Sequence, residues 1–384
     1  MHRTAPVGDH PREDQMKYGI IEQGYVRRDA DPFERVRQLV TEAQQADKYG
    51  FTSFAVSEQH FKFPTNSTGA LDVILPWVAA TTDLRMLPSA AILSLHHPLA
   101  IAERWATIDV LSEGRLDFAV GRGNTPKTAS AFQIPHAETN ARTMESLDII
   151  FRAWSGEEFS YKGDFWEFED IRVHPIPAQR PHPRVSLAAV SPGSAALAGK
   201  HQLGYLGGMH WLRWAQVHDR VNAYNEAWET GTPFEYAQPL HHISLQVPTH
   251  VAKTDKLARE QVEFGIVEYA NRAMKQDILN HQLTYGTDSG MDTTGEFYDN
   301  FDGLLDLTSM IVGSPQLAID KLLRVHEEYD IDEIIFHLDY AKHDELLECI
   351  RLLGEEVLPV VEKETARNPR PARTLATSTV ASVS

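Results

Sequence analysis

Three groups of residues in this sequence have types and spacings that suit chemistry. The first is Glu58-Gln59-His60, which directly follows a short apolar run. Histidine is the side chain that most readily exchanges a proton near neutral pH, and a carboxylate two residues away can tune it. Residues i and i+2 point to the same face of an extended chain, so Glu58 and His60 can face one site. We therefore consider His60, with Glu58 and Gln59 beside it, a candidate for catalytic proton transfer.

The second group is Ser191-Pro192-Gly193-Ser194, which follows another apolar run. Ser191 can cap a helix, Pro192 fits its first turn, and Gly193 lets a ligand approach the backbone closely. The free N–H groups, the two hydroxyls and the helix dipole all favour a bound phosphate. Ser191 and Ser194 therefore form a candidate anion site, for which the alternative is a plain helix cap.

The third group combines small residues with one cation. Ala90 and Ala91 lie near the end of one apolar run, and Gly121 and Arg122 close the next. Small side chains leave room for a large, flat molecule to lie against the backbone, and the alternative is that Ala90 and Ala91 are small residues of the core. Arg122 can stabilise an anionic ligand at this place, and the alternative is an arginine in a surface ion pair.

These groups need elements that bring them together, and residues 84–123 predict such a unit. A short, mostly apolar run over 84–93 predicts a buried strand. Apolar residues then recur at helical spacing from Pro98 until Gly114, and a second buried strand follows over 116–120. A helical connection between two buried strands implies a parallel pair with a right-handed crossover, so both strands end on the same side.

The whole chain repeats this alternation of strands and helices. Buried strands are predicted at eight places: 17–21, 51–57, 84–93, 116–120, 185–190, 203–208, 243–247 and 333–338. This count predicts a single α/β TIM (β/α)8 barrel, in which function collects at the carboxyl ends of the strands. A doubly wound sheet is the alternative, but Gly121-Arg122-Gly123 lacks the third glycine of a dinucleotide fingerprint and leads into a loop.

Differences in composition divide the chain into an N-terminal extension, a barrel and a C-terminal tail. Residues 1–15 are polar and predict an N-terminal extension, residues 16–364 form the barrel, and residues 365–384 read as a C-terminal tail rich in Pro, Ala, Ser and Thr. Two insertions interrupt the barrel pattern, at 156–183 and at 249–310. The first is aromatic and proline-rich and predicts a hairpin with an extended connection, and the second predicts a helical lid.

Charge and composition exclude several classes of protein. The 384 residues carry a formal net charge of −18, so no basic stripe is available for a nucleic-acid partner. No window approaches the roughly 18 apolar residues of a membrane span, and the first residues lack the apolar core of a secretion signal. The single cysteine, Cys349, excludes a disulfide framework. We therefore expect a cytoplasmic protein without a membrane partner.

The 18 histidines prompt a search for metal ligands. His96-His97 and His241-His242 are adjacent pairs, whose side chains point in divergent directions on an extended chain. No His-x-His sequence ends the first strand, and no cysteine cluster of the zinc type is present. We therefore predict no metal site, and a barrel metallohydrolase is the rival class of enzyme.

Four segments carry a family resemblance. The run SEGRLDFAVGRG at 112–123, preceded by AERWATIDVLS and by AAIL, resembles the bacterial luciferase-like flavin-dependent oxidoreductases and monooxygenases. FTSFAVSEQHF at 51–61 resembles the strand of that family that ends in Glu-His-His-Phe. The similarity extends over residues 16–359. It implies a TIM barrel, and family members are commonly homodimers.

The resemblance also implies roles for site residues. It implies that Ser191 and Ser194 bind the flavin phosphate together with Arg142, and that Ala90 and Ala91 support the isoalloxazine ring, often through a non-prolyl cis peptide. Reduced flavin is anionic near its pyrimidine edge, which Gly121 and Arg122 can stabilise.

The sequence departs from the family pattern at Gln59, which replaces the first histidine of the family's pair, used there as a catalytic base. Either His60 takes that role or the chemistry needs no base there. The change argues against a light-emitting reaction.

The reaction that this resemblance implies is oxygenation of a small organic substrate. A separate NAD(P)H:flavin reductase supplies reduced FMN (FMNH2), O2 adds to form a flavin C4a-hydroperoxide, and one oxygen atom goes to the substrate. Two alternatives stay open. One is hydride transfer with the deazaflavin F420, which binds related barrels, and the other is a non-catalytic flavin-binding homologue.

Overall fold

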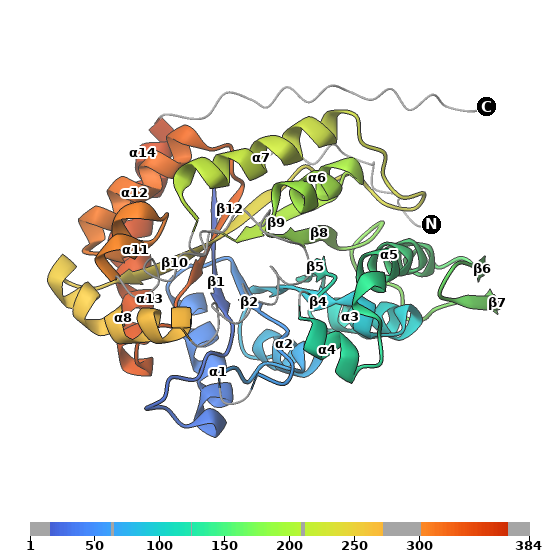
Figure 1. Cartoon of the computed structure of the whole chain (residues 1–384), viewed down its shortest axis with the longest axis horizontal. Helices are drawn as coiled ribbons and strands as arrows, with labels where there is room; N and C mark the ends of the chain where they lie inside the picture. The colour runs from blue at the N-terminus through green and yellow to red at the C-terminus, as the bar shows by residue number, and fades with distance from the viewer. Residues whose placement is uncertain (1–15, 63–64, 124, 209–211, 272–300, 368–384) are drawn as a thin grey trace, which may run out of the picture.

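Ten strands form one parallel sheet that nearly closes into a barrel (Figure 1). The computed structural model describes residues 16–62, 65–123, 125–208, 212–271 and 301–367. Nine strands follow one another around the sheet, in the order β3 (Arg85–Pro88), β2 (Ser53–Val56), β1 (Lys17–Glu22), β12 (Glu333–His337), β10 (Ile243–Val251), β9 (Gly204–Gly208), β8 (Arg184–Ala189), β5 (Asp117–Gly121) and β4 (Ala91–Ile92).

The strands at the two ends of this sheet, β3 and β4, together occupy one strand position of the barrel. β3 pairs with β2 and β4 pairs with β5, and only Ser89 and Ala90 separate β3 from β4. A parallel bridge between Met86 and Leu116 also joins β3 to the start of β5. Counted in this way the barrel has eight positions, each within a few residues of a predicted strand. The predicted TIM barrel is confirmed.

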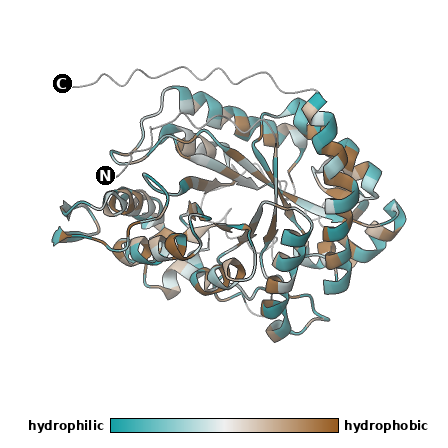
Figure 2. Ribbon diagram, turned by 180° about the vertical axis from the view of Figure 1, so that it is seen from behind, coloured by the Kyte–Doolittle hydropathy of each residue, from teal (hydrophilic) through white to brown (hydrophobic). Residues whose placement is uncertain are grey.

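Helices surround the barrel: α1 (Pro32–Lys48), α2 (Leu71–Ala79), α3 (Pro98–Leu111), α4 (Pro126–Ala131), α5 (Thr139–Ser155), α6 (Pro192–Lys200), α7 (Trp214–Glu229), α8 (Asp255–Tyr269), α11 (Phe301–Leu307), α12 (Pro315–Glu328), α13 (His343–Leu352) and α14 (Leu358–Arg367). Their starts follow simple chemistry: Asp31 caps α1 by accepting from the Phe33 N–H, and α1, α3, α6 and α12 have proline in the first turn. Hydrophobic residues lie along the strands and on helix faces turned toward them (Figure 2).

Side chains fill the barrel interior below its carboxyl end. One apolar cluster takes a single residue from each of six strands: Ile21, Ala55, Leu87, Ala119, Leu206 and Ile335. The barrel is therefore a packed core rather than a pore, as in other barrels of this kind. A ligand must bind at the rim above this layer.

Buried charges hold the amino end of the barrel together. Asp117, the first residue of β5, accepts two hydrogen bonds from Arg85 at 2.6 and 2.8 Å and two from Arg184 at 2.6 and 2.8 Å. Burial alone would raise the pKa of the Asp117 carboxyl, but the two guanidinium groups outweigh it and hold the pKa far below its usual range. These ion pairs tie three strands together at the end opposite the site.

The two predicted insertions differ from the regular barrel pattern. β6 (Phe159–Lys162) and β7 (Glu167–Ile171) form the antiparallel hairpin expected in the first, and it lies beside α5 at the edge of the molecule (Figure 1). In the second, β10 continues to Val251, so the first three residues belong to the barrel, and β11 (Ile311–Gly313) pairs with β10 after it. Part of the predicted lid, residues 272–300, lies outside the described residues. Residues 1–15 and residues 368–384 of the predicted tail also lie outside them.

None of the helices in the described ranges combines the length and the apolar character that crossing a membrane requires.

Candidate active site

A cavity of about 540 Å³ opens at the carboxyl ends of the barrel strands. Residues from β1, β2, β5, β8, β9 and β10, or from the turns that follow them, line it together with α5 and α6. Most of the site residues predicted from the sequence are among them: Glu58, Gln59, His60, Ala90, Gly121, Arg122, Ser191 and Ser194. Residues that were predicted from strand ends in distant parts of the chain therefore lie around one cavity.

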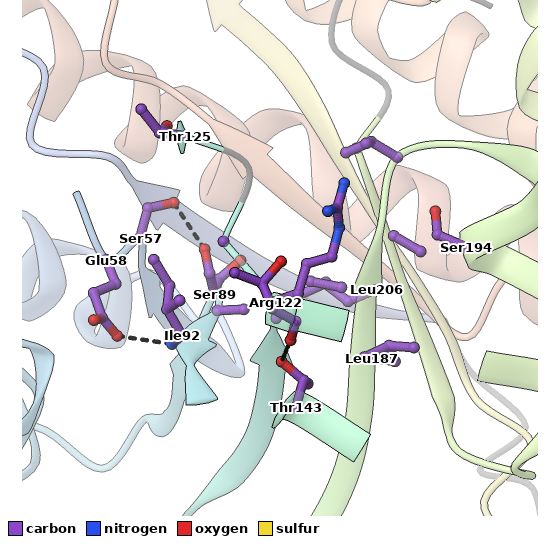
Figure 3. A pocket seen from close by; sticks show the side chains of 18 of the residues that line it. Ser57, Glu58, Ser89, Ile92, Arg122, Thr125, Thr143, Leu187, Ser194 and Leu206 are labelled. Atoms are coloured by element: carbon purple, nitrogen blue, oxygen red, sulfur yellow. Dashed lines mark hydrogen bonds between the residues drawn. The ribbon is translucent and has the colours of Figure 1, made fainter. Parts of the chain in front are cut away.

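Small residues and a hydrogen-bonded turn form one wall of this cavity. The peptide bond between Ser89 and Ala90 is cis, at the interruption between β3 and β4. Ser57 donates from its Oγ to the Ser89 carbonyl oxygen at 2.8 Å (Figure 3). Gln246 donates from Nε2 to the Ser89 hydroxyl at 2.5 Å. A Cβ added at Gly121 would lie 3.3 Å from the Ala90 Cβ, so larger side chains would fill this surface.

The two alanines of the predicted pair have different surroundings. Ala90 lines the cavity, whereas Ala91 is buried in the hydrophobic core and is not a lining residue. The non-prolyl cis bond expected near this pair precedes Ala90. Ser89 and Ala90, rather than Ala90 and Ala91, thus line the cavity.

The start of α6 lines the opposite wall, where Figure 3 places Ser194 across the cavity from Glu58. Ser191 and Ser194 form a reciprocal capping box: the Ser191 Oγ accepts from the Ser194 N–H at 3.2 Å, and the Ser194 Oγ accepts from the Ser191 N–H at 3.0 Å. Gly193 is exposed, and a Cβ there would meet nothing within 4 Å. The predicted cap is therefore present, and it presents a helix N-terminus to the cavity.

Arg142, predicted to bind the phosphate with these serines, is not among the residues that line the cavity. Its guanidinium binds Glu138 at 2.8 and 2.9 Å and lies 4.3 Å from the ring centre of Phe165 in the hairpin segment. α5 instead contributes Asn140 and Thr143 to the lining.

Two cationic side chains line the cavity, Lys62 and Arg122. Arg122 follows β5, and its side chain extends upward beside the cavity wall in Figure 3. Burial lowers the pKa of its guanidinium, so an anion in the cavity would stabilise the charged form.

Glu58 and His60 share one hydrogen bond at the cavity edge, with 2.6 Å between Glu58 Oε1 and His60 Nε2. His96, which the sequence analysis did not assign to this site, brings its Nε2 to 3.1 Å from the same oxygen. The other oxygen, Oε2, accepts from the Ile92 N–H at 2.9 Å (Figure 3). Burial alone would raise the pKa of Glu58, but the hydrogen bonds from both histidines outweigh it and lower the pKa.

A buried network fixes the end of β1 next to the cavity. Asp339 accepts the backbone N–H of Gln23 at 2.5 Å and pairs with Arg35 at 2.6 Å. The Tyr269 hydroxyl donates to Gln23 Oε1 at 2.7 Å, and both Gln23 and Tyr269 line the cavity. Asp339 itself stays outside the lining. It therefore positions Gln23 rather than facing a ligand.

Known proteins resemble this chain in sequence. The family model described as luciferase-like monooxygenase matches residues 16–330. The chain belongs to this family. Limonene 1,2-monooxygenase of Rhodococcus erythropolis is 24% identical to the chain over 358 residues, which cover 90% of the chain and 86% of that protein. F420-dependent glucose-6-phosphate dehydrogenase of Kineococcus radiotolerans is 30% identical over 175 residues, 44% of the chain and 51% of that protein.

Solved structures of monooxygenases share the luciferase-like barrel. Monooxygenase RslO1 from Streptomyces bottropensis matches with a TM-score of 0.76 and 25% identity, covering 90% of this chain and 99% of that one. The oxygenating constituent of 3,6-diketocamphane monooxygenase from Pseudomonas putida, solved in complex with FMN, matches with a TM-score of 0.73 and 20% identity. It covers 90% of this chain and 98% of that one.

Several residues at or beside this cavity were missed from sequence. Ser57 and Ser89 directly follow β2 and β3, so the rule about strand ends could have found them. Gln246 is an amide between Leu245 and Val247 in the buried strand β10, and a polar residue in a buried strand was the available signal. No local sequence pattern linked His96 to Glu58, because 38 positions separate the two residues.

Proposed function

We propose that this luciferase-like protein is a monooxygenase that uses reduced FMN and O2 to oxygenate a small organic substrate. The observation that carries the proposal is the division of the cavity into two unlike walls. One wall has the small residues Ala90 and Gly121, and the other has the N-terminus of α6. A flat ring joined to a phosphate by a short chain matches this arrangement.

The residues present fit FMN on physical grounds. A Cβ at Gly121 would crowd Ala90, so this surface is shaped for a ring plane rather than for protruding side chains. The backbone N–H groups at the start of α6 suit a phosphate, and Arg122 suits the anionic edge of the reduced ring. Bound FMN would supply the electrons that activate O2.

The chain's own contribution is to hold the ring, keep water away and place the substrate. Apolar side chains occupy much of the lining, among them Ile92, Leu187, Leu206 and Leu212. Such a lining excludes water from the reacting centre and receives an apolar substrate. The substrate of this protein is therefore expected to be mainly apolar.

The catalytic roles of Glu58, Gln59 and His60 stay predictions. Glu58 fixes the orientation of His60 through the hydrogen bond of 2.6 Å, and all three residues line the cavity. A separate reductase as the source of reduced FMN, and a homodimeric assembly, rest on the family resemblance and are proposals as well.

Hydride transfer with F420 is the second candidate function. F420-dependent glucose-6-phosphate dehydrogenases are among the relatives, with the similarity limited to less than half of this chain. In sequence, limonene 1,2-monooxygenase matches over 90% of the chain, and this difference in sequence coverage favours oxygenation.

One titration separates the candidates. The purified protein is titrated with FMN, reduced FMN and F420, and binding is followed by flavin fluorescence and absorbance. We expect reduced FMN to bind more tightly than F420, and substrate to couple oxygen consumption to product formation. Preferred binding of F420 would support hydride transfer. Tight FMN binding with no coupled oxygen consumption across many substrates would indicate a non-catalytic flavin-binding protein.

A further inference from the structure

Three ligand-type atoms converge at the edge of the cavity. Glu58, His60 and His96 each offer one ligand-type atom, and these three atoms lie within 4.8 Å of one another. In the part of the chain that the structure describes, this is the one group of three histidine, cysteine or acidic side chains gathered so closely. The residues come from the end of β2 and from the turn before α3.

The distances are close to those of a tetrahedral metal site. Zinc binds nitrogen and carboxylate oxygen at about 2.0–2.2 Å, so its ligands lie about 3.4 Å apart. Here Glu58 Oε1 is 2.6 Å from His60 Nε2 and 3.1 Å from His96 Nε2. Both separations are within about 1 Å of that spacing, so small side-chain shifts would let one ion bind Glu58 and each histidine.

The surroundings hold these side chains in place. The Ile92 N–H binds the second Glu58 oxygen at 2.9 Å and leaves Oε1 directed at the histidines. The Phe132 ring packs against both imidazoles, with centroid distances of 5.0 Å to His60 and 6.3 Å to His96. The side chains of Glu58, His60 and His96 are 6%, 13% and 26% exposed, so an ion would be shielded from bulk water but reachable.

We propose that Glu58, His60 and His96 form a binding site for a divalent transition-metal ion with zinc-like ligand preference. Two imidazoles and one carboxylate are the ligand set of many three-ligand zinc sites, which keep a fourth position open. Glu58 and His60 line the cavity, so the metal site borders the space proposed for the substrate. The Nε2 protons of the two imidazoles move to Nδ1 or to solvent when the ion binds.

This inference goes beyond the proposed oxygenation and replaces the expectation of no metal site. The adjacent histidines do diverge, as predicted: His97 is exposed, and its Nδ1 accepts the Leu99 N–H at the start of α3. Only His96 turns toward Glu58. A bound ion would hold His60 in its coordination shell, so metal binding is expected to inhibit turnover.

The test measures metal binding directly and needs no flavin. The full chain is treated with a chelator, dialysed, and titrated with Zn²⁺ by calorimetry and with Co²⁺ by absorption spectroscopy. We expect one high-affinity ion per chain and Co²⁺ ligand-field bands typical of a low-coordinate site. His96→Gln and Glu58→Gln should each weaken Zn²⁺ binding by at least about tenfold.

His97→Gln is the matched control, because it removes the neighbouring histidine without touching the group. It should bind Zn²⁺ as the unaltered chain does. Circular dichroism melting curves identify any variant that fails to fold, and His96→Gln keeps the test usable if Glu58→Gln is unstable. The proposal is overturned if no stoichiometric ion binds, or if His96→Gln and His97→Gln bind Zn²⁺ equally well.

Discussion

The Ser57 hydroxyl donates a hydrogen bond to the backbone oxygen of Ser89 at 2.8 Å, and so joins the end of β2 to the break between β3 and β4. This contact lies at the cavity, because Ser57, Ser89 and Ala90 all line it. Because Ser57 is buried, water cannot readily replace its hydroxyl as the donor to the Ser89 oxygen. The shape of the proposed ring site thus depends on a polar contact between neighbouring strand positions.

Ser57→Ala should therefore weaken both the fold and FMN binding. Leaving a buried carbonyl without its donor costs about 1–3 kcal/mol, measured as the free energy of unfolding in urea. Ser67→Ala is the control, since Ser67 donates a comparable hydrogen bond to the Gly24 backbone oxygen and does not line the cavity. Equal FMN affinity in the two variants would show that the Ser57 contact does not shape the ring site.

A charge placed at the start of α6 tests the phosphate assignment. Ser194→Asp should weaken FMN binding by about tenfold or more, because the carboxylate repels the phosphate at short range. Aspartate is favourable in the first turn of a helix, so the helix itself should stay intact. Ser194→Asn, similar in size but neutral, should bind FMN more tightly than Ser194→Asp, as followed by fluorescence quenching.

Riboflavin, which lacks the phosphate, makes this experiment sharper. Ser194→Asp and Ser194→Asn should bind riboflavin equally well, because only the phosphate meets the new charge. A loss of riboflavin affinity that matches the loss of FMN affinity would instead mean that the substitution disturbs the ring site.

The barrel could be predicted because each strand buries an apolar run and each helix has clear start and stop signals. The strand predicted over 116–120 is β5, Asp117–Gly121, and the strand predicted over 333–338 is β12, Glu333–His337. Both runs are buried throughout, so hydrophobicity alone locates them. The short strand β11 was missed, since three residues carry too little periodicity to be recognised.

The site was harder to predict where side-chain direction depends on distant packing. Arg142 lies on the predicted helix, but Phe165 of the hairpin segment packs on its guanidinium and Glu138 pairs with it. The position of that hairpin against α5 follows from no local spacing rule. His96 reaches Glu58 only because the barrel brings the turn before α3 next to the end of β2.

Arg122 should set the redox behaviour of bound FMN. Reduced FMN carries a negative charge that the oxidised form lacks, so Arg122→Gln should weaken binding of the reduced form more than that of the oxidised form. A tenfold difference corresponds to a midpoint potential lower by about 30 mV for a two-electron couple. Dye-equilibration titration measures this shift, and Arg122→Lys should restore most of it. An unchanged potential in Arg122→Gln would place the guanidinium away from the flavin ring.

The ion pairs at the amino end of the barrel should control acid stability without affecting the site. The pKa of Asp117 is lower in the folded chain than in the unfolded chain, where it is about 3.9. The unfolded state therefore binds the proton first, and the stabilisation by Asp117 is complete above that pH and is lost as the pH falls toward the folded pKa. Asp117→Asn should lower the free energy of unfolding at pH 7 by about 3–5 kcal/mol, since it leaves Arg85 and Arg184 without their carboxylate.

The same substitution should flatten the acid side of the stability profile, measured by urea unfolding between pH 7 and pH 3. Glu34→Gln is the control, because Glu34 pairs with Arg37 on the surface, where both side chains are more than half exposed and such a pair contributes little. FMN affinity at pH 7 should be unchanged in Asp117→Asn, because Asp117 starts β5 and the cavity lies beyond its other end. An Asp117→Asn variant that kept the full acid-dependent loss of stability would show that other carboxylates control it.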